Sequence, residues 1–138
     1  MNPTSTLVSR RAAAAARFAL GAVLALGAGV ANALTVVPYT PAALAAAQQG
    51  GQPVVVQFHA SWCPTCKAQD KVIETLKSDP SLNVTLMQAD YDTEKALEKQ
   101  MKVTAQSTLI AFHGSTERAR VVGETDPARL KAILKSAQ

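Results

Sequence analysis

FHASWCPTCK, residues 58–67, contains the only two cysteines of this 138-residue chain, Cys63 and Cys66. An apolar run at residues 54–56 precedes the motif, and a segment with helical periodicity follows it. Two thiols three positions apart at a helix start lie on one face of that helix, at a spacing that a disulfide can bridge. The unpaired N–H groups and the positive end of the helix dipole favour the thiolate of Cys63. The motif therefore indicates dithiol–disulfide exchange, in which a thiolate attacks another disulfide and its partner thiol releases it.

Two other roles of the cysteine pair fit the sequence less well. A zinc site needs about four ligands, and beside the cysteines the chain has only two histidines, His59 and His113, at no finger-like spacing. A purely structural disulfide would close a very short loop here and restrain little of the unfolded chain. We therefore assign neither a metal nor an organic cofactor to the pair, and we take the dithiol itself as the redox centre.

The first 33 residues predict an export signal. Three arginines without acidic residues precede an apolar run of 13 residues, 18–30. Ala31-Asn32-Ala33 is a small-x-small cleavage site, so we expect cleavage after Ala33 and a periplasmic protein. The apolar run is short for a membrane span, which needs about 20 residues. Tethering to the inner membrane by an uncleaved signal is the alternative.

Residues 34–138 form the second predicted unit, which is large enough for one compact domain. The chain has 14 basic and 10 acidic residues, and three of the basic residues lie in the predicted signal, so this domain carries a net charge of about +1. No basic patch interleaves with aromatic residues, and we expect no nucleic-acid partner. Export to an oxidising compartment makes disulfide chemistry available and requires a membrane or periplasmic partner that resets the redox state.

Periodicity, caps and turn residues predict eight elements in this domain, in the order α, β, α, β, α, β, β, α. Thr40-Pro41 and Asp126-Pro127 are cap signatures of the first and last helices. Thr93 is expected to cap the third helix, with Ala96 on its inner side. Strand–helix–strand units predict parallel pairing, and the closing hairpin adds an antiparallel edge. The expected strands are residues 52–60, 84–89, 108–112 and 118–122. The expected helix that begins at the cysteines is residues 63–76. The fold class is therefore α/β, with a central mixed sheet of about four strands flanked by helices.

These features resemble the thioredoxin family. Phe58-x-Ala-x-Trp62-Cys-x-x-Cys-Lys67 is similar to the active-site segment of that family, and the element order fits residues 34–138. The resemblance implies a thioredoxin-like fold, with Cys63 as an exposed attacking nucleophile and Cys66 as a buried resolving thiol. It also implies that partner chains pair with the backbone beside the site. The substrate-binding residues would then be Trp62, Pro64, Thr65, Gln106, Ser107 and Thr108. A core aromatic residue is the alternative for Trp62.

Two neutral amides depart from the family pattern. Gln57 and Gln88 stand where most thioredoxins have a buried aspartate and often a lysine. We expect these amides to contribute hydrogen bonds without a titrating base, so that deprotonation of Cys66 depends on water or on the substrate. Two packed polar residues without a kinetic role are the alternative. His59, two residues beyond Gln57, is a further candidate for tuning Cys63 and is otherwise a packed strand residue.

Ser107 is the third departure, because it occupies the position at which a proline of the family usually faces the cysteines. Serine brings an N–H group and a hydroxyl that proline lacks. In this family the proline is thought to keep metals away from the thiolates. Its absence raises the alternative of a metal ion or an iron–sulfur cluster bound across a dimer through Cys63 and Cys66. Without such a cluster we expect a monomer.

The sequence thus predicts a thiol–disulfide oxidoreductase that acts on protein thiols and disulfides through a Cys-Pro-Thr-Cys centre. A non-catalytic module that holds client chains near Trp62 and Ser107 is the main alternative. Pro64-Thr65 resembles the oxidising sites of this fold. Gln88-Ala89-Asp90 instead resembles the terminal domain of a bacterial inner-membrane reductant relay. Both directions of electron flow therefore remain open.

Overall fold

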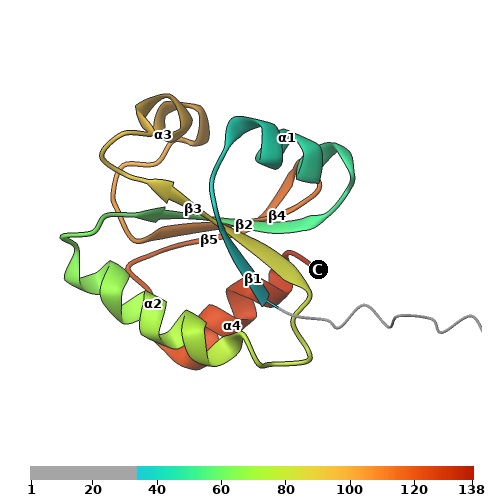
Figure 1. Cartoon of the computed structure of the whole chain (residues 1–138), viewed down its shortest axis with the longest axis vertical. Coiled ribbons are helices and arrows are strands. Elements are labelled where there is room, and N and C mark those ends of the chain that lie inside the picture. The colour runs from blue at the N-terminus through green and yellow to red at the C-terminus, as the bar shows by residue number, and fades with distance from the viewer. Residues whose placement is uncertain (1–33) are drawn as a thin grey trace, which may run out of the picture.

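The computed structural model describes residues 34–138, and the predicted export signal with its cleavage site lies outside the described residues. Residues 34–138 form a five-stranded mixed sheet and four helices (Figure 1). The strands are β1 (Leu34–Pro38), β2 (Pro53–His59), β3 (Val84–Asp90), β4 (Thr108–His113) and β5 (Thr116–Val122). The helices are α1 (Pro41–Gln49), α2 (Pro64–Leu76), α3 (Lys95–Met101) and α4 (Pro127–Ser136).

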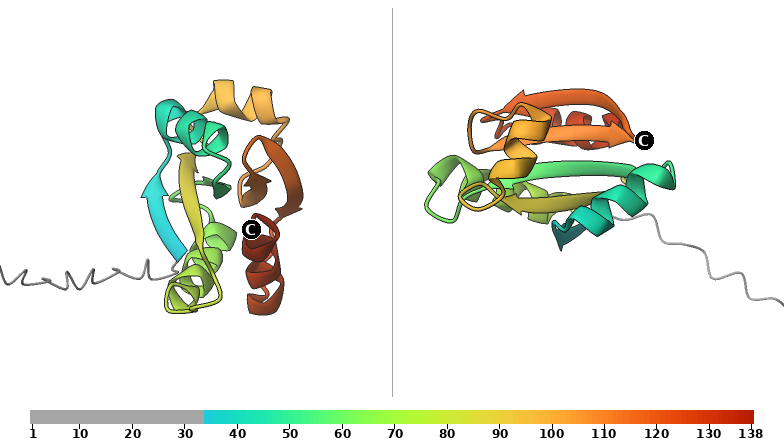
Figure 2. Two further views of the ribbon diagram at one scale, coloured as in Figure 1. Left: turned by 90° about the vertical axis from the view of Figure 1, so that its right-hand side faces the viewer. Right: turned by 90° about the horizontal axis from the view of Figure 1, so that it is seen from above.

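Strand β2 lies at the centre of the sheet, whose strand order is β1-β3-β2-β4-β5. It pairs parallel with β3 and antiparallel with β4. Figures 1 and 2 show α1 and α3 on one face of the sheet and α2 and α4 on the other. Val55 packs with the second helix pair, whereas Val54 and Val56 pack with the first. Burial on both faces explains why this strand is continuously apolar, and it confirms the predicted central strand.

The carboxyl end of β2 positions the redox motif. Because β2 ends at His59 and α2 begins at Pro64, residues 60–63 cross the end of the sheet. In the antiparallel register Phe58 lies opposite Thr108, the first residue of β4. The residue before β4 therefore lies beside the cysteine motif, although about forty positions separate them in the sequence.

Strand β1 is a fifth strand, beyond the four or so that the sequence predicts. It pairs parallel with β3 at the edge of the sheet, and its only buried side chain is that of Leu34. A five-residue edge strand with one buried side chain has little of the alternation by which strands are recognised. The rest of the predicted element order is confirmed.

Of the three helix caps that the sequence predicts, two are present in the structure and one is not. The hydroxyl of Thr40 accepts a hydrogen bond from an N–H of α1 at 3.1 Å, and Asp126 caps α4 at 2.9 Å. The predicted cap at Thr93 is wrong, because Glu94 is the residue before α3 and makes no side-chain cap. The carboxylate of Asp90 accepts the N–H of Thr93 at 3.1 Å, which draws residue 93 into the preceding turn.

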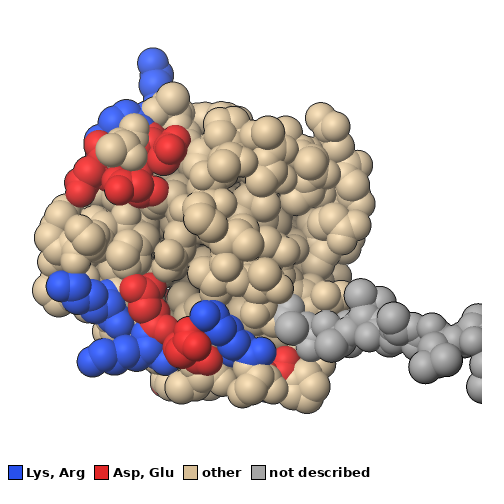
Figure 3. Space-filling model, in the orientation of Figure 1, with Lys and Arg blue, Asp and Glu red and all other residues tan. Residues whose placement is uncertain are grey.

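Charged side chains on the face viewed in Figure 3 lie over α2 and α3, with both signs mixed, while the surface over α1 and β1 is uncharged. Within α3, Ala96 is exposed rather than inward, and Glu98 is buried in contact with the Lys95 ammonium at 3.0 Å. No helix in residues 34–138 has the length and apolar character needed to cross a bilayer.

A candidate active site of two thiols and one hydroxyl

Cys63 is the N-cap residue of α2, and its sulfur takes the place of the usual capping oxygen. The Sγ atom accepts a hydrogen bond from the backbone N–H of Cys66 at 3.1 Å. Pro64 follows at the first helical position, where its missing N–H costs nothing. The helix start therefore aims an N–H group and its positive dipole end at the first sulfur, as the sequence predicts.

Both cysteines are free thiols, and both are buried. The expected exposure of Cys63 is wrong, because the residue is only 1% accessible. Ala60 and Cys66 pack around it in a small core cluster that Tyr91 partly covers. Its sequence neighbour Trp62, by contrast, is 56% exposed. Because exchange needs contact between two sulfurs, the side chains packed around Cys63 must move before a partner disulfide can reach it.

Trp62 is not a core aromatic residue. Its exposed indole donates a hydrogen bond to the carboxylate of Asp92 at 2.8 Å, which anchors the ring beside the motif. The polar edge of the indole is thus held, while the ring remains exposed to solvent. Contact of Trp62 with a partner chain stays a prediction.

Opposite pKa shifts distinguish the two thiols. Burial alone would raise the pKa of Cys63, but hydrogen bonds from the side chains of Cys66 and Ser107 and from the backbone of Cys66 and Thr65 outweigh it and lower the pKa. Burial raises the pKa of Cys66, and its hydrogen bond with Cys63 raises it further. Cys63 is therefore the thiol that ionises first, and Cys66 keeps its proton.

We expect the ultraviolet absorbance of the reduced protein to rise in two steps with pH. The first step, for Cys63, falls below the pH at which a free cysteine ionises, and the second falls above it. The rate of attack on a small disulfide should rise with the first step, since only the thiolate attacks. In a Cys63→Ser control only the late step should remain. A single step at the pKa of free cysteine in the unaltered protein would contradict this assignment.

Ser107 contacts both sulfurs with one hydroxyl. Its Oγ atom lies 3.1 Å from the Sγ of Cys63 and 3.1 Å from the Sγ of Cys66. The residue has φ 61°, in the left-handed region. Its N–H donates to the carbonyl of Phe58 at 2.8 Å. A proline fits neither feature, because its ring fixes φ near −65° and removes the N–H.

The other predicted substrate-binding residues surround the thiols at different depths. Pro64 is exposed, Thr65 and Gln106 are half-buried, and Thr108 is buried. The hydroxyl of Thr108 donates to the carbonyl of Ala105 at 2.7 Å, so this hydroxyl is already used within the loop. Contact of these residues with substrate stays a prediction.

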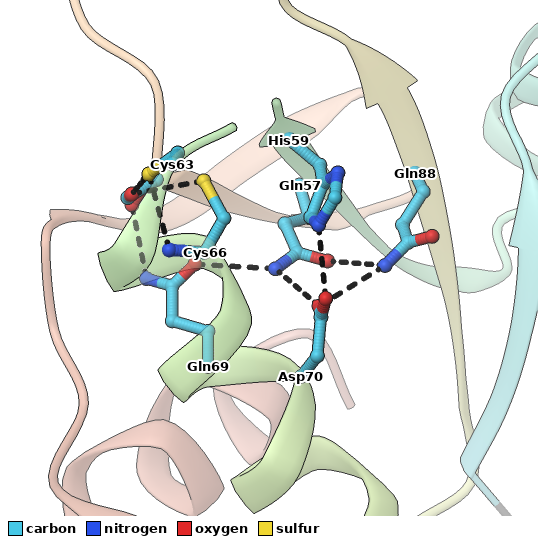
Figure 4. A network of polar contacts seen from close by, with 8 residues as sticks. Gln57, His59, Cys63, Cys66, Gln69, Asp70 and Gln88 are labelled. Carbon is cyan, nitrogen blue, oxygen red and sulfur yellow. Dashed lines mark hydrogen bonds and ion pairs between the residues drawn. The ribbon is translucent and has the colours of Figure 1, made fainter. Parts of the chain in front are cut away.

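Three glutamines form a chain of hydrogen bonds from the backbone of Ser107 into the interior (Figure 4). The fully buried amide of Gln69 donates to the carbonyl of Ser107 at 3.0 Å and to that of Glu124 at 2.9 Å. Gln69 in turn accepts a hydrogen bond from Gln57 at 3.1 Å, and Gln57 accepts one from Gln88 at 3.1 Å. The predicted hydrogen bonding of Gln57 and Gln88 is thus present, with Gln69 as a partner that the sequence did not reveal.

Asp70 is the second residue of the site that sequence reasoning missed. Its carboxylate lies 3.4 Å from the amide of Gln57 and 3.2 Å from that of Gln88. Its other oxygen lies 2.9 Å from Nε2 of His59 (Figure 4). A carboxylate thus accompanies the two amides, but it makes no hydrogen bond to Cys66. That Cys66 loses its proton to water or to the substrate stays a prediction. Positions 69 and 70 lie three and four residues after Cys66, on the same helix face, and this spacing was the signal available.

The Asp70 end of this network borders solvent. Two shallow clefts of about 220 Å³ and about 190 Å³ lie on either side of Gln88, the first lined by His59 and the second by Asp70. Within residues 34–138, no three His, Cys, Asp or Glu side chains gather as a metal site would require. A cluster held by Cys63 and Cys66 would need its remaining ligands from another molecule.

Comparison with known proteins agrees with this geometry. The family model described as Thioredoxin matches residues 37–136. Thioredoxin from Mycobacterium tuberculosis (strain H37Rv) is 32% identical over 79 residues, which are 57% of this chain and 68% of that protein. The bifunctional thioredoxin reductase/thioredoxin of Mycobacterium leprae is 33% identical over 79 residues, 57% of this chain but only 17% of that longer protein. The crystal structure of Trxlp from Edwardsiella tarda has TM-score 0.69 and 39% identity, and the match covers 72% of this chain and 98% of that one. The chain belongs to the thioredoxin family, whose members are thiol–disulfide oxidoreductases.

Proposed function

We propose that this protein is an exported oxidoreductase that exchanges disulfides with protein substrates in the periplasm. The observation that supports it best is the division of labour between the thiols: Cys63 has a lowered pKa at a helix N-terminus, and Cys66 has a raised one directly behind it. Such a pair combines an attacking thiolate with a protonated resolving thiol.

In the reducing direction the exchange has two steps. The thiolate of Cys63 attacks one sulfur of a substrate disulfide, forms a mixed disulfide and expels the other substrate sulfur as a thiolate. Cys66 then loses its proton and attacks the Sγ of Cys63, which breaks the mixed disulfide and releases the second substrate sulfur. Two electrons pass to the substrate, and the protein is left with a Cys63–Cys66 disulfide. A periplasmic or membrane dithiol partner would reduce it again.

The substrate surface that we propose lies around Trp62 and the end of β5. Val122 is 60% exposed, and in the β4–β5 register it lies opposite Thr108. The N–H of Gly123 donates to the carbonyl of Ser107 at 3.0 Å, so the end of β5 lies beside the backbone of Ser107. Two exposed apolar side chains, Trp62 and Val122, would thus flank the buried thiols and contact an extended partner chain.

Insulin-disulfide reduction with dithiothreitol as electron donor tests the proposal. The unaltered protein should accelerate precipitation of the insulin B chain, and the Cys63→Ser/Cys66→Ser variant should not. Both proteins should bind a reduced client peptide equally, because the exposed surface is unchanged. No acceleration by the unaltered protein, with client binding intact in both, would instead identify a client-binding module.

A further inference from the structure

The side chain of Ser107 places one hydroxyl against both sulfurs of the site. Its Oγ atom is 3.1 Å from the Sγ of Cys63 and 3.1 Å from the Sγ of Cys66. Within residues 34–138 the two sulfurs are the only hydrogen-bond partners of this hydroxyl. The residue is only 3% accessible, so the protein rather than solvent surrounds the hydroxyl. Its hydrogen bond is therefore available to the cysteine pair in both redox states.

The backbone of Ser107 fixes the hydroxyl in this place. The N–H of the residue donates to the carbonyl of Phe58 at 2.8 Å, and its own carbonyl accepts from Gly123 and from Gln69, each at 3.0 Å. These contacts hold a φ of 61°, which is unfavourable for a residue with a side chain. Strain at a residue in contact with both reacting sulfurs is consistent with a functional constraint on its position.

A hydroxyl binds an ionised dithiol and a disulfide with different strength. Hydrogen bonds to an ionised acceptor are roughly twice as strong as those between neutral groups, and neutral sulfur is a weak acceptor. Burial opposes the ionisation of both thiols. The hydrogen bond with Ser107 favours ionisation, so it contributes to the lowered pKa of Cys63 and limits the rise in the pKa of Cys66. The hydroxyl thus stabilises the ionised reduced pair more than it stabilises the oxidised pair.

No other side chain outside the pair makes a hydrogen bond to either sulfur in the described part of the chain. Tyr91 packs on the cysteine cluster, but its hydroxyl donates to the carbonyl of Thr104 at 3.3 Å. The carboxylate of Asp70 contacts His59 and two amides rather than a sulfur. Ser107 is therefore the one side chain besides the cysteines through which the fold there can bind the thiolate directly.

On the basis of the proposed exchange reaction, we propose that the hydroxyl of Ser107 raises the reduction potential of the Cys63–Cys66 pair by binding the ionised dithiol more tightly than the disulfide. Reduction of the disulfide takes up two electrons and one proton and gives the thiolate of Cys63 with the thiol of Cys66. Stabilising this product makes the disulfide a stronger oxidant. Compared with the same site without the hydroxyl, exchange is shifted toward passing the disulfide to client thiols, which lose the two electrons.

Equilibration with glutathione measures this shift in the variants Ser107→Gly and Ser107→Ala, which both remove the hydroxyl. Glycine also accepts a φ of 61° without strain. Each protein disulfide that forms converts one oxidised glutathione into two reduced ones, and acid quenching with mass spectrometry counts both protein forms. Above the first ionisation step we expect the oxidation constant to rise about tenfold in both variants, the scale of one hydrogen bond to a charged group. The potential then falls by about 30 mV.

The pH dependence separates the hydroxyl from a change in packing. A bond that favours the thiolate contributes fully above the pH at which Cys63 ionises in the variants. The contribution is lost as the pH falls through the Cys63 step of the unaltered protein. Below that step the variants and the unaltered protein should therefore have nearly equal oxidation constants. An equal shift at every pH, or no shift at any pH, would overturn the proposal.

The matched controls are Ser115→Gly and Ser115→Ala, at an exposed serine on the opposite end of β4 from Ser107, and both should keep the unaltered constant. An unaltered protein that forms no Cys63–Cys66 disulfide at any glutathione ratio would overturn the proposed function, and the tuning with it. Should neither variant at position 107 fold, nuclear magnetic resonance of the unaltered reduced protein decides. The Cβ signal of Ser107 must shift with the first ionisation step, and an unmoved signal would rule the tuning out.

Discussion

A Cys66→Ser variant is expected to become a covalent trap for disulfide substrates. Cys63 keeps the backbone N–H of residue 66, which lies 3.1 Å from its sulfur, so the thiolate still forms and attacks. A serine hydroxyl cannot resolve the mixed disulfide, because it is far less acidic and less nucleophilic than a thiol. Turnover should therefore fall by a factor on the order of 10³ or more, the scale seen when a reacting nucleophile is lost.

Non-reducing electrophoresis and mass spectrometry would detect the trapped complex after mixing with a disulfide-bonded protein, and dithiothreitol should release it. The Cys63→Ser variant is the control and should form no complex, since Cys66 is buried and has a raised pKa. Complexes of equal yield in both variants would show that the attacking thiol has been assigned to the wrong residue.

Replacing Gln69 by leucine is expected to have the largest effect on stability. Gln69 is fully buried and makes hydrogen bonds to Ser107, Glu124 and Gln57. Leucine has a similar size but removes all three hydrogen bonds. The carbonyl of Ser107 keeps its bond from Gly123, and the amide of Gln57 keeps its contact with Asp70. A hydrogen bond contributes about 0.5–1.5 kcal/mol net to stability, so we expect the loss of three to lower the free energy of unfolding by about 2–4 kcal/mol.

Urea denaturation of the reduced proteins would measure this loss. Gln100→Leu is the matched control, because Gln100 is an exposed glutamine of α3 and its replacement should shift stability by less than about 0.5 kcal/mol. Similar midpoints for Gln69→Leu and the control would show that the glutamine network does not stabilise the fold.

The parts of the fold that the sequence predicts correctly are those with strong local signals. The run of Val54 to Val56 has no polar alternation because β2 is covered on both faces, and Thr40 and Asp126 cap their helices through short-range contacts. Pro64 marks the first turn of α2 for a similar local reason. These features depend on residues within a few positions of one another, so they can be recognised without the tertiary structure.

The features that escaped prediction depend on contacts between distant segments. In the sequence, Asp70 occupies a position typical of an exposed helix residue. Only the packing of α2 on β2 brings its carboxylate to His59 and Gln57. The burial of Cys63 likewise depends on packing against segments that the motif itself does not contain. At Ser107, the sequence shows the departure from proline but not the left-handed backbone or the double contact with the sulfurs.

The left-handed backbone at position 107 also limits how this site can change by mutation. A single Ser107→Pro exchange would demand a φ of opposite sign and delete the N–H that bonds to Phe58. The serine and proline versions of the loop are thus separated by an epistatic barrier, since the surrounding residues must be rebuilt before proline becomes acceptable. Grafting a thioredoxin-type proline loop onto this domain will therefore require exchange of the whole segment before β4, not of one codon.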